Sequence, residues 1–147
     1  RSMYWDETGL RWVNPSPNIR DMDAALAYAG VAIPENQLSM GRGTSEPFHL
    51  LGTPWIQDTK ALADALTTSV LPGVKVEPVE FVPTGTYAKG HAGEGQVCHG
   101  VRYTITDRRA FRPFAMGVLL MDHLYARYGM TLIPERRWDA KQAKWLY

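Results

Sequence analysis

The strongest constraint on the fold is a strict alternation of side chains over residues 97–105, which predicts a β-strand. The residues in one phase are Val97, His99, Val101, Tyr103 and Ile105. Because successive side chains of a strand point to opposite faces, this phase would line one face of a sheet. It is the clearest strand in the sequence, so the fold must contain a sheet.

Helical periodicity and end signals predict three helices, at 21–30, 58–69 and 113–129. Asp21 and Asp58 are the expected N-caps of the first two, and Pro113 opens the third. Gly30 is expected to end the first helix as a left-handed residue, and Gly129 to end the third. The third helix is expected to bury one stripe: Phe114, Val118, Met121, Leu124, Tyr125 and Tyr128.

Further strands are predicted at the start of 10–18, where a short strand runs into a proline-stiffened loop, and at 74–81, with a short one at 48–51. Pro78 lies inside the second of these, so we expect a bulge or an edge position there. Glycine-rich loops would fill much of 31–57 and 82–96. This order of elements is typical of an α+β or α/β protein, and we expect a single α+β domain with a small mixed sheet packed with helices.

Composition excludes several classes of function. The 147 residues suit one domain, and 16 Lys+Arg against 15 Asp+Glu give a net charge of +1, too weak a field to indicate nucleic acid or an anionic membrane as a partner. No apolar run approaches the roughly 18 residues that a membrane span needs. The single cysteine, Cys98, allows no internal disulfide and no cysteine-rich metal site.

Arg42 stands between two glycines in the segment Ser-Met-Gly-Arg-Gly-Thr at 39–44. Flanking glycines permit positive φ angles and close backbone approach, so the guanidinium can be aimed at a carboxylate of a ligand. The segment is not a phosphate loop, because no Gly-Lys-Ser/Thr follows. The alternative is a tight turn in which Arg42 pairs with a carboxylate of the protein itself.

Other candidates for chemistry are weaker. Cys98 and His99 would point to opposite faces of the strand and cannot bind one metal ion, so we expect neither a metal nor a cofactor. His91, in its glycine-rich loop, is better placed to meet a ligand or is a plain surface histidine. Four aromatic residues offer platforms for a sugar ring or belong to the core: Trp5, Trp12, Trp55 and Tyr87.

Five segments of the chain, in order, resemble the NamZ-type exo-β-N-acetylmuramidases. They are WDETGLRWVNPSPN at 5–18, LSMGRGTSEPFHLLGTPW at 38–55, PVEFVPT at 78–84, HAGEGQVCHGV at 91–101 and TDRRAFRPFAMGVLLM at 106–121. The resemblance covers the family's second half and implies that residues 1–147 form a C-terminal domain whose Rossmann-like N-terminal domain is absent. Met40 and His49 depart from the pattern, because family members often carry other residues at these two positions. At the position of His49 the common residue is Glu.

The resemblance implies release of terminal N-acetylmuramic acid from the non-reducing ends of peptidoglycan fragments. It places the catalytic glutamate in a Glu-His-Gly motif of the N-terminal domain, so the fragment alone should be inactive. It also implies a periplasmic or secreted location. The implied partners are peptidoglycan-derived sugars and the chain's own N-terminal domain. The seam that this domain would cover favours self-association into a homo-oligomer.

Muramic acid carries a lactyl ether that ends in a carboxylate, a natural partner for a guanidinium. We therefore expect Arg42, held by its glycines, to bind substrate together with Asn18, Gly43, Thr44 and His91. Two alternatives remain, a non-catalytic glycan-binding module and a structural domain that docks on its partner. A hydrolase of the Gly-x-Ser-x-Gly type has no support, because the sequence lacks that motif.

Overall fold

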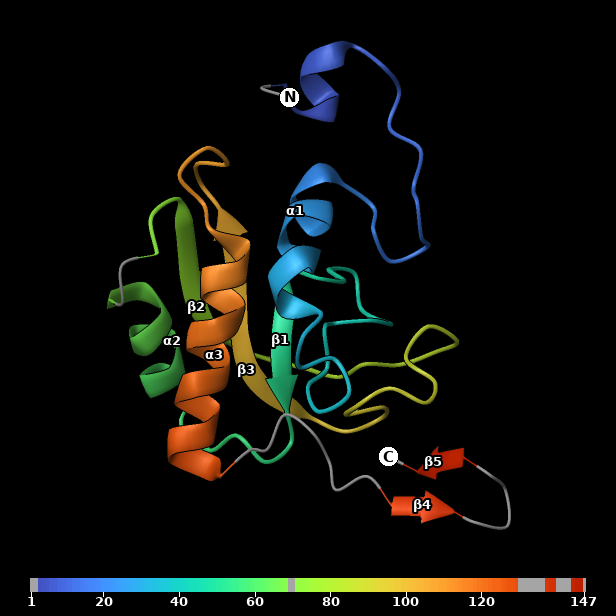
Figure 1. The fold of residues 1–147 in the computed structure, drawn as a ribbon, viewed down its shortest axis with the longest axis vertical. Helices are drawn as coiled ribbons and strands as arrows, with labels where there is room; N and C mark the ends of the chain where they lie inside the picture. Colours follow the sequence, from blue (N-terminus) through green and yellow to red (C-terminus); the bar gives the residue numbers. More distant parts are fainter. Residues whose placement is uncertain (1–2, 69–70, 130–136, 140–143, 147) are drawn as a thin grey trace.

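The structure is a computed structural model and describes residues 3–68, 71–129, 137–139 and 144–146. The helical elements are η1 (Trp5–Thr8, a 3₁₀ helix), α1 (Met22–Val31), α2 (Thr59–Thr68) and α3 (Pro113–Tyr128). The strands are β1 (Leu50–Thr53), β2 (Val74–Phe81), β3 (Cys98–Ile105), β4 (Arg137–Asp139) and β5 (Lys144–Leu146). Figure 1 shows α1, α2 and α3 on one face of the sheet formed by the first three strands.

The strand predicted from alternation, β3, is the central strand of this sheet, whose order is β1-β3-β2. Val101 and Tyr103 are buried in the core beneath the helices, as the alternation predicts. The α+β class is therefore confirmed. The pairings of β3 with β1 and with β2 are antiparallel, so this sheet is antiparallel where a mixed sheet was expected.

Pro78 lies in β2, an edge strand, as expected for a residue without an amide hydrogen. It pairs with Val101, and the register runs unbroken from Val74 to Phe81, so the strand needs no bulge. The short strand expected at the start of 10–18 is wrong, whereas the proline-stiffened loop expected after it is present and extends over the whole segment. That segment is loop with an isolated bridge between Ser16 and Ile19, because Pro15 and Pro17 withhold amide donors from a ladder.

The helix caps follow the prediction. A carboxylate oxygen of Asp21 accepts a hydrogen bond from the backbone of Ala24 at 2.8 Å, and Asp58 does the same for Ala61 at 2.9 Å. The third helix ends at Gly129 with φ 65°. The expected end of the second helix at Ser69 lies outside the described residues.

Gly30 does not end the first helix, which continues through Val31. A Cβ at Gly30 would lie 1.9 Å from the carbonyl oxygen of Pro113, and a Cβ at Gly117 would lie 2.5 Å from that of Gly30. The glycine is therefore required for close packing of α1 on α3, and the prediction of a left-handed terminus there is wrong.

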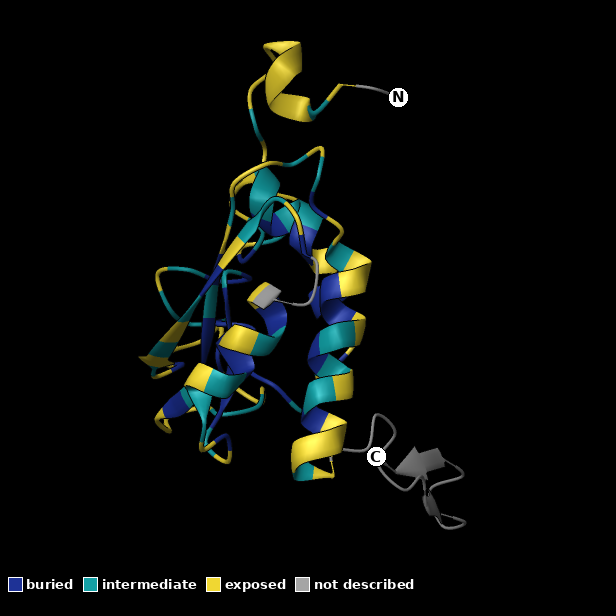
Figure 2. Cartoon of the chain, turned by 90° about the vertical axis from the view of Figure 1, so that its left-hand side faces the viewer, coloured by how far each residue is buried: buried dark blue, intermediate teal, exposed yellow. Residues whose placement is uncertain are grey.

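This close packing also decides which face of α3 is buried. The buried residues are Met116, Gly117, Leu120 and Leu124. Of the predicted stripe, Leu124 is buried and Met121 and Tyr128 pack partly buried against the core, but Phe114, Val118 and Tyr125 are exposed, so half of the predicted face is wrong. Figure 2 shows buried and exposed residues interleaved along this helix. The side of α3 that carries Gly117 faces α1 at Gly30.

The N-terminal segment is attached to the turn before α3. The hydroxyl of Tyr4 donates to the carbonyl oxygen of Arg108 at 2.8 Å, and Arg108 pairs with Asp6 and, at 2.6 Å, with Asp23. Hydrogen bonding to Arg108 lowers the pKa of the Asp6 carboxyl. These contacts hold η1 next to the start of α1 (Figure 1). No helix in the described part of the chain is long and apolar enough to cross a bilayer.

Candidate functional site

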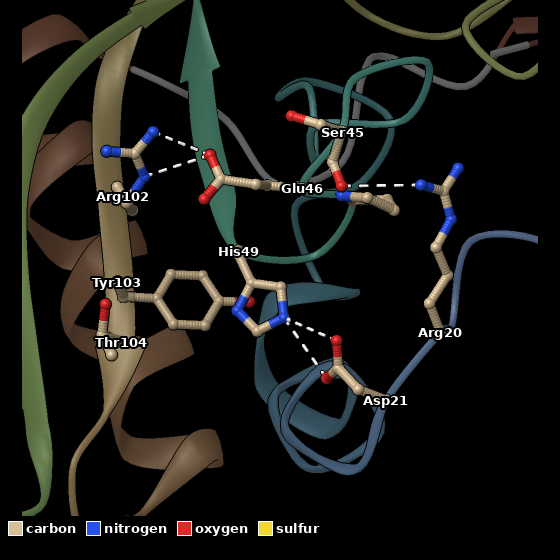
Figure 3. A pocket seen from close by; sticks show the side chains of 9 residues that line it. Arg20, Asp21, Ser45, Glu46, His49, Arg102, Tyr103 and Thr104 are labelled. Carbon is tan, nitrogen blue, oxygen red and sulfur yellow. Dashed lines mark hydrogen bonds and ion pairs between the residues drawn. The ribbon is translucent and has the colours of Figure 1, made fainter. Parts of the chain in front are cut away.

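A pocket of about 320 Å³ lies where the start of α1, the turn before β1 and the strand β3 meet. We call it the Arg20 pocket, and Figure 3 shows its lining side chains. They come from three separate parts of the chain: Arg20, Asp21, Ser45, Glu46, Pro47, His49, Arg102, Tyr103 and Thr104. The volume falls in the range of small-molecule sites.

Helix capping and the sheet together position one wall of the pocket. Asp21 caps α1, and the Nε2 atom of His49 lies 3.3 Å from each of its carboxylate oxygens. The carbonyl oxygen of His49 accepts a hydrogen bond from the amide of Tyr103 at 3.0 Å, which fixes His49 beside β3. Just before it, Phe48 takes a left-handed φ of 64°, and this turns the chain into β1.

The charges of the pocket are unequally compensated. Arg102 donates two hydrogen bonds to one carboxylate oxygen of Glu46, at 2.7 and 3.1 Å, so these two charges offset each other. Arg20 donates to the carbonyl oxygens of Pro17, at 3.1 Å, and Ser45, at 3.5 Å. Over the residues that the structure describes, Arg20 has no carboxylate partner. Its exposed guanidinium is therefore available to an anion.

Tyr103 contributes a buried polar group. Its side chain is 1% exposed, and its hydroxyl has no hydrogen-bond partner in the described part of the chain. Burial, with a further contribution from Asp21 and Asp23, raises the pKa of this phenol well above its usual value. The hydroxyl is therefore protonated at neutral pH and can donate a hydrogen bond.

Arg42 has a different environment. Gly41 and Gly43 take positive φ angles of 70° and 79°, which glycine permits. The guanidinium pairs with Glu35 and lies 4.8 Å from the ring centroid of Phe48, and its side chain is only 15% exposed. Pairing with an internal carboxylate, the alternative to ligand binding, is thus what the structure shows, and Arg42 lines neither this pocket nor the cavity described below.

The glycine next to Arg42 has a packing role. A Cβ at Gly43 would lie 2.2 Å from the carbonyl oxygen of Thr84, so the two glycine-rich loops approach each other here. Thr44 donates its hydroxyl to the carbonyl oxygen of Gly41 at 2.6 Å and accepts from the amide of Glu46 at 3.1 Å. Both residues therefore shape the turn that carries Ser45 and Glu46 to the Arg20 pocket.

Asn18 and His91 also lie outside the lining of the pocket. Asn18 is 7% exposed, and its side-chain oxygen has no partner among the described residues, so it is a buried acceptor without a donor. His91 is exposed in the second glycine-rich loop. The assignment of substrate binding to Asn18, Arg42, Gly43, Thr44 and His91 stays a prediction.

Cys98 and His99 point to opposite faces of β3, as predicted. Cys98 is fully buried against Gly93, and burial raises the pKa of its thiol to about 11. His99 is bound at its Nδ1 atom to Glu80 at 3.0 Å. Because a thiol with so high a pKa is almost wholly protonated at neutral pH, this cysteine is a poor nucleophile.

Sequence reasoning missed the residues that form the Arg20 pocket. Asp21 was identified only as a helix cap, and His49 only as a departure from a family pattern. A signal was present for Arg20, which follows the rigid Pro-Ser-Pro-Asn segment by two positions and precedes the helix cap. A cation held at a fixed place beside a helix start is a reasonable candidate for binding an anion.

Comparison with known proteins gives a consistent result. A family model described as exo-β-N-acetylmuramidase NamZ, C-terminal, matches residues 26–145. The peptidoglycan β-N-acetylmuramidase NamZ of Bacillus subtilis strain 168 is 35% identical over 129 residues, which are 87% of this chain and 30% of that protein. The crystal structure of a DUF1343 family protein from Bacteroides fragilis NCTC 9343 has a TM-score of 0.75 at 27% identity, covering 88% of this chain and 33% of that one. The chain thus spans about a third of the length of these relatives.

Proposed function

Because the chain belongs to the family of NamZ C-terminal domains, we propose that it is the substrate-recognition part of a peptidoglycan glycoside hydrolase. The reaction is the release of terminal N-acetylmuramic acid from non-reducing ends of glycan fragments, and the Bacillus subtilis relative is named as a peptidoglycan β-N-acetylmuramidase. In this proposal the domain binds and orients the sugar, and the remainder of the enzyme supplies the catalytic acid.

One observation supports the recognition role. The guanidinium of Arg20 lies at a pocket and has no acidic partner in the described chain. Muramic acid differs from glucosamine by its lactyl carboxylate, and a planar guanidinium binds a carboxylate through two parallel hydrogen bonds. Asp21 and His49, on the adjoining wall, offer an acceptor and a ring nitrogen to sugar hydroxyl or acetamido groups.

The carboxylates of the pocket support binding rather than cleavage. Glycoside hydrolysis generally needs two carboxyl groups on opposite sides of the scissile bond, one of them protonated to act as the acid. Asp21 caps α1 and contacts His49, and Glu46 is held by Arg102. Both carboxylates are thus engaged in contacts within the domain, which supports a role in holding the sugar.

Two further expectations from the resemblance stay proposals. We propose a periplasmic or secreted location, where peptidoglycan lies. The exposed apolar side chains of α3, Phe114, Val118 and Tyr125, are consistent with a surface that another part of the enzyme or another copy covers.

The proposal predicts binding without turnover by the chain itself. Titration with the disaccharide N-acetylmuramyl-β-1,4-N-acetylglucosamine, followed by NMR, should shift the signals of Arg20, Asp21 and His49 and release no free muramic acid. N,N′-diacetylchitobiose is the matched ligand without the lactyl carboxylate, and we expect it to bind at least about 10-fold more weakly. Equal affinity for the two disaccharides would show that the domain does not recognise the lactyl carboxylate. Binding of neither disaccharide would favour a purely structural domain.

A further inference from the structure

A second cavity, of about 490 Å³, adjoins the Arg20 pocket on the side of the N-terminal segment. The two share Arg20 and Asp21 as lining residues, so they meet at these two side chains. We call it the Trp cavity. Its remaining walls include two indoles, two aliphatic side chains and one cation: Trp5, Trp12, Leu10, Met22 and Arg108.

The apolar side chains of the Trp cavity are accessible. Trp5 is 41% exposed and Leu10 59% exposed, although both lie in a segment held against the body of the domain by Arg108 and Arg109. The indole nitrogen of Trp5 donates to the carbonyl oxygen of Arg11 at 3.3 Å, which fixes the ring while leaving it partly open to solvent. A fixed, open aromatic ring offers a flat apolar platform at little cost in side-chain entropy.

Trp12 adds an unsatisfied donor. Its indole nitrogen is buried and has no acceptor in the described part of the chain. A buried donor without a partner is costly, and native structures rarely leave one without a reason. A small movement of the ring toward a ligand in the cavity would give this donor an oxygen acceptor.

We propose that the Trp cavity is a second saccharide subsite, which holds the sugar ring linked to the muramic residue in the Arg20 pocket. This inference rests on the proposed function. A pyranose ring has one face of C–H groups that packs on an indole and a rim of hydroxyl groups that bonds to polar side chains. The Trp cavity provides both kinds of partner, and Arg20 lies at the junction of the two subsites.

The experiment compares a one-ring and a two-ring ligand. The chain should bind the muramyl-glucosamine disaccharide more tightly than N-acetylmuramic acid alone, measured by calorimetry. Trp5→Ala should weaken binding of the disaccharide about 10-fold and leave the affinity for the monosaccharide unchanged. Trp5→Tyr keeps an aromatic ring and should recover much of the lost affinity for the disaccharide. This variant distinguishes the loss of ring stacking from a structural disturbance of the N-terminal segment.

Trp55→Ala is the matched control, because Trp55 is similarly exposed, at 39%, but packs on Tyr128 away from both cavities. It should change neither affinity. If the unmodified chain binds both ligands equally, or if Trp5→Ala weakens both by the same factor, the second subsite does not exist. Failure of the proposed function is a different result, in which Arg20→Ala leaves the affinity for the monosaccharide unchanged.

Discussion

Replacing Arg20 with alanine in an enzyme that carries this domain should lower kcat/KM for a muramyl substrate about 100-fold. A charge-assisted hydrogen bond contributes up to about 3 kcal/mol, and Arg20 has no carboxylate partner in the described chain to compete for its guanidinium. Arg20→Lys keeps the charge but loses the planar fork, so we expect an intermediate loss of about 10-fold. The measurement is steady-state kinetics with muramyl and glucosaminyl substrates side by side.

The glucosaminyl substrate is the control, because it lacks the lactyl carboxylate and should be little affected by either change. Arg42→Ala provides the comparison within the protein. Its guanidinium is paired with Glu35 and packed on Phe48, so its loss should lower the free energy of unfolding without discriminating between substrates. A selective loss for Arg42→Ala and none for Arg20→Ala would restore the assignment made from sequence and contradict the one made from geometry.

Gly30→Ala should have the largest effect on stability, about 3 kcal/mol of the free energy of unfolding. The added Cβ would lie 1.9 Å from the carbonyl oxygen of Pro113, which is backbone and cannot rotate away. Helices α1 and α3 would have to separate, and overpacking typically costs about 1 to 3 kcal/mol. Urea unfolding followed by circular dichroism measures the change.

Gly9→Ala is the matched control for this prediction. Gly9 has a φ of 72° but no atom within 4 Å of the added Cβ, so only the backbone preference is lost, at about 1 kcal/mol. Similar losses for the two variants would mean that α1 and α3 do not approach each other as closely as described. Because α1 carries Asp21 at its start, we also expect Gly30→Ala to disturb the Arg20 pocket.

The elements that sequence predicts well are those whose signals are local. The alternation at 97–105 and the caps at Asp21 and Asp58 depend on residues within one strand or one turn, and the structure confirms them. The buried face of α3 is different, since it follows from the contact between Gly117 and Gly30, which are far apart in sequence. The stripe predicted from helical periodicity omitted Met116 and Leu120, which are buried, and included Phe114, Val118 and Tyr125, which are exposed.

The candidate site illustrates the same limit. The glycines around Arg42 indicate that positive φ angles are permitted there, and both residues have them. They do not reveal whether the guanidinium already has a partner, and Glu35 pairs with it from the preceding loop. Conversely, Arg20, His49 and Arg102 lie in three distant segments, and no spacing in the sequence shows that they line one pocket.

The central claim is that this domain recognises muramic acid through Arg20, and a crystal structure of the chain with N-acetylmuramic acid tests it most directly. The account predicts the lactyl carboxylate about 3 Å from the guanidinium nitrogens of Arg20, with the sugar beside Asp21 and His49. A sugar bound elsewhere, with its carboxylate on Arg42 or on no arginine, would contradict it.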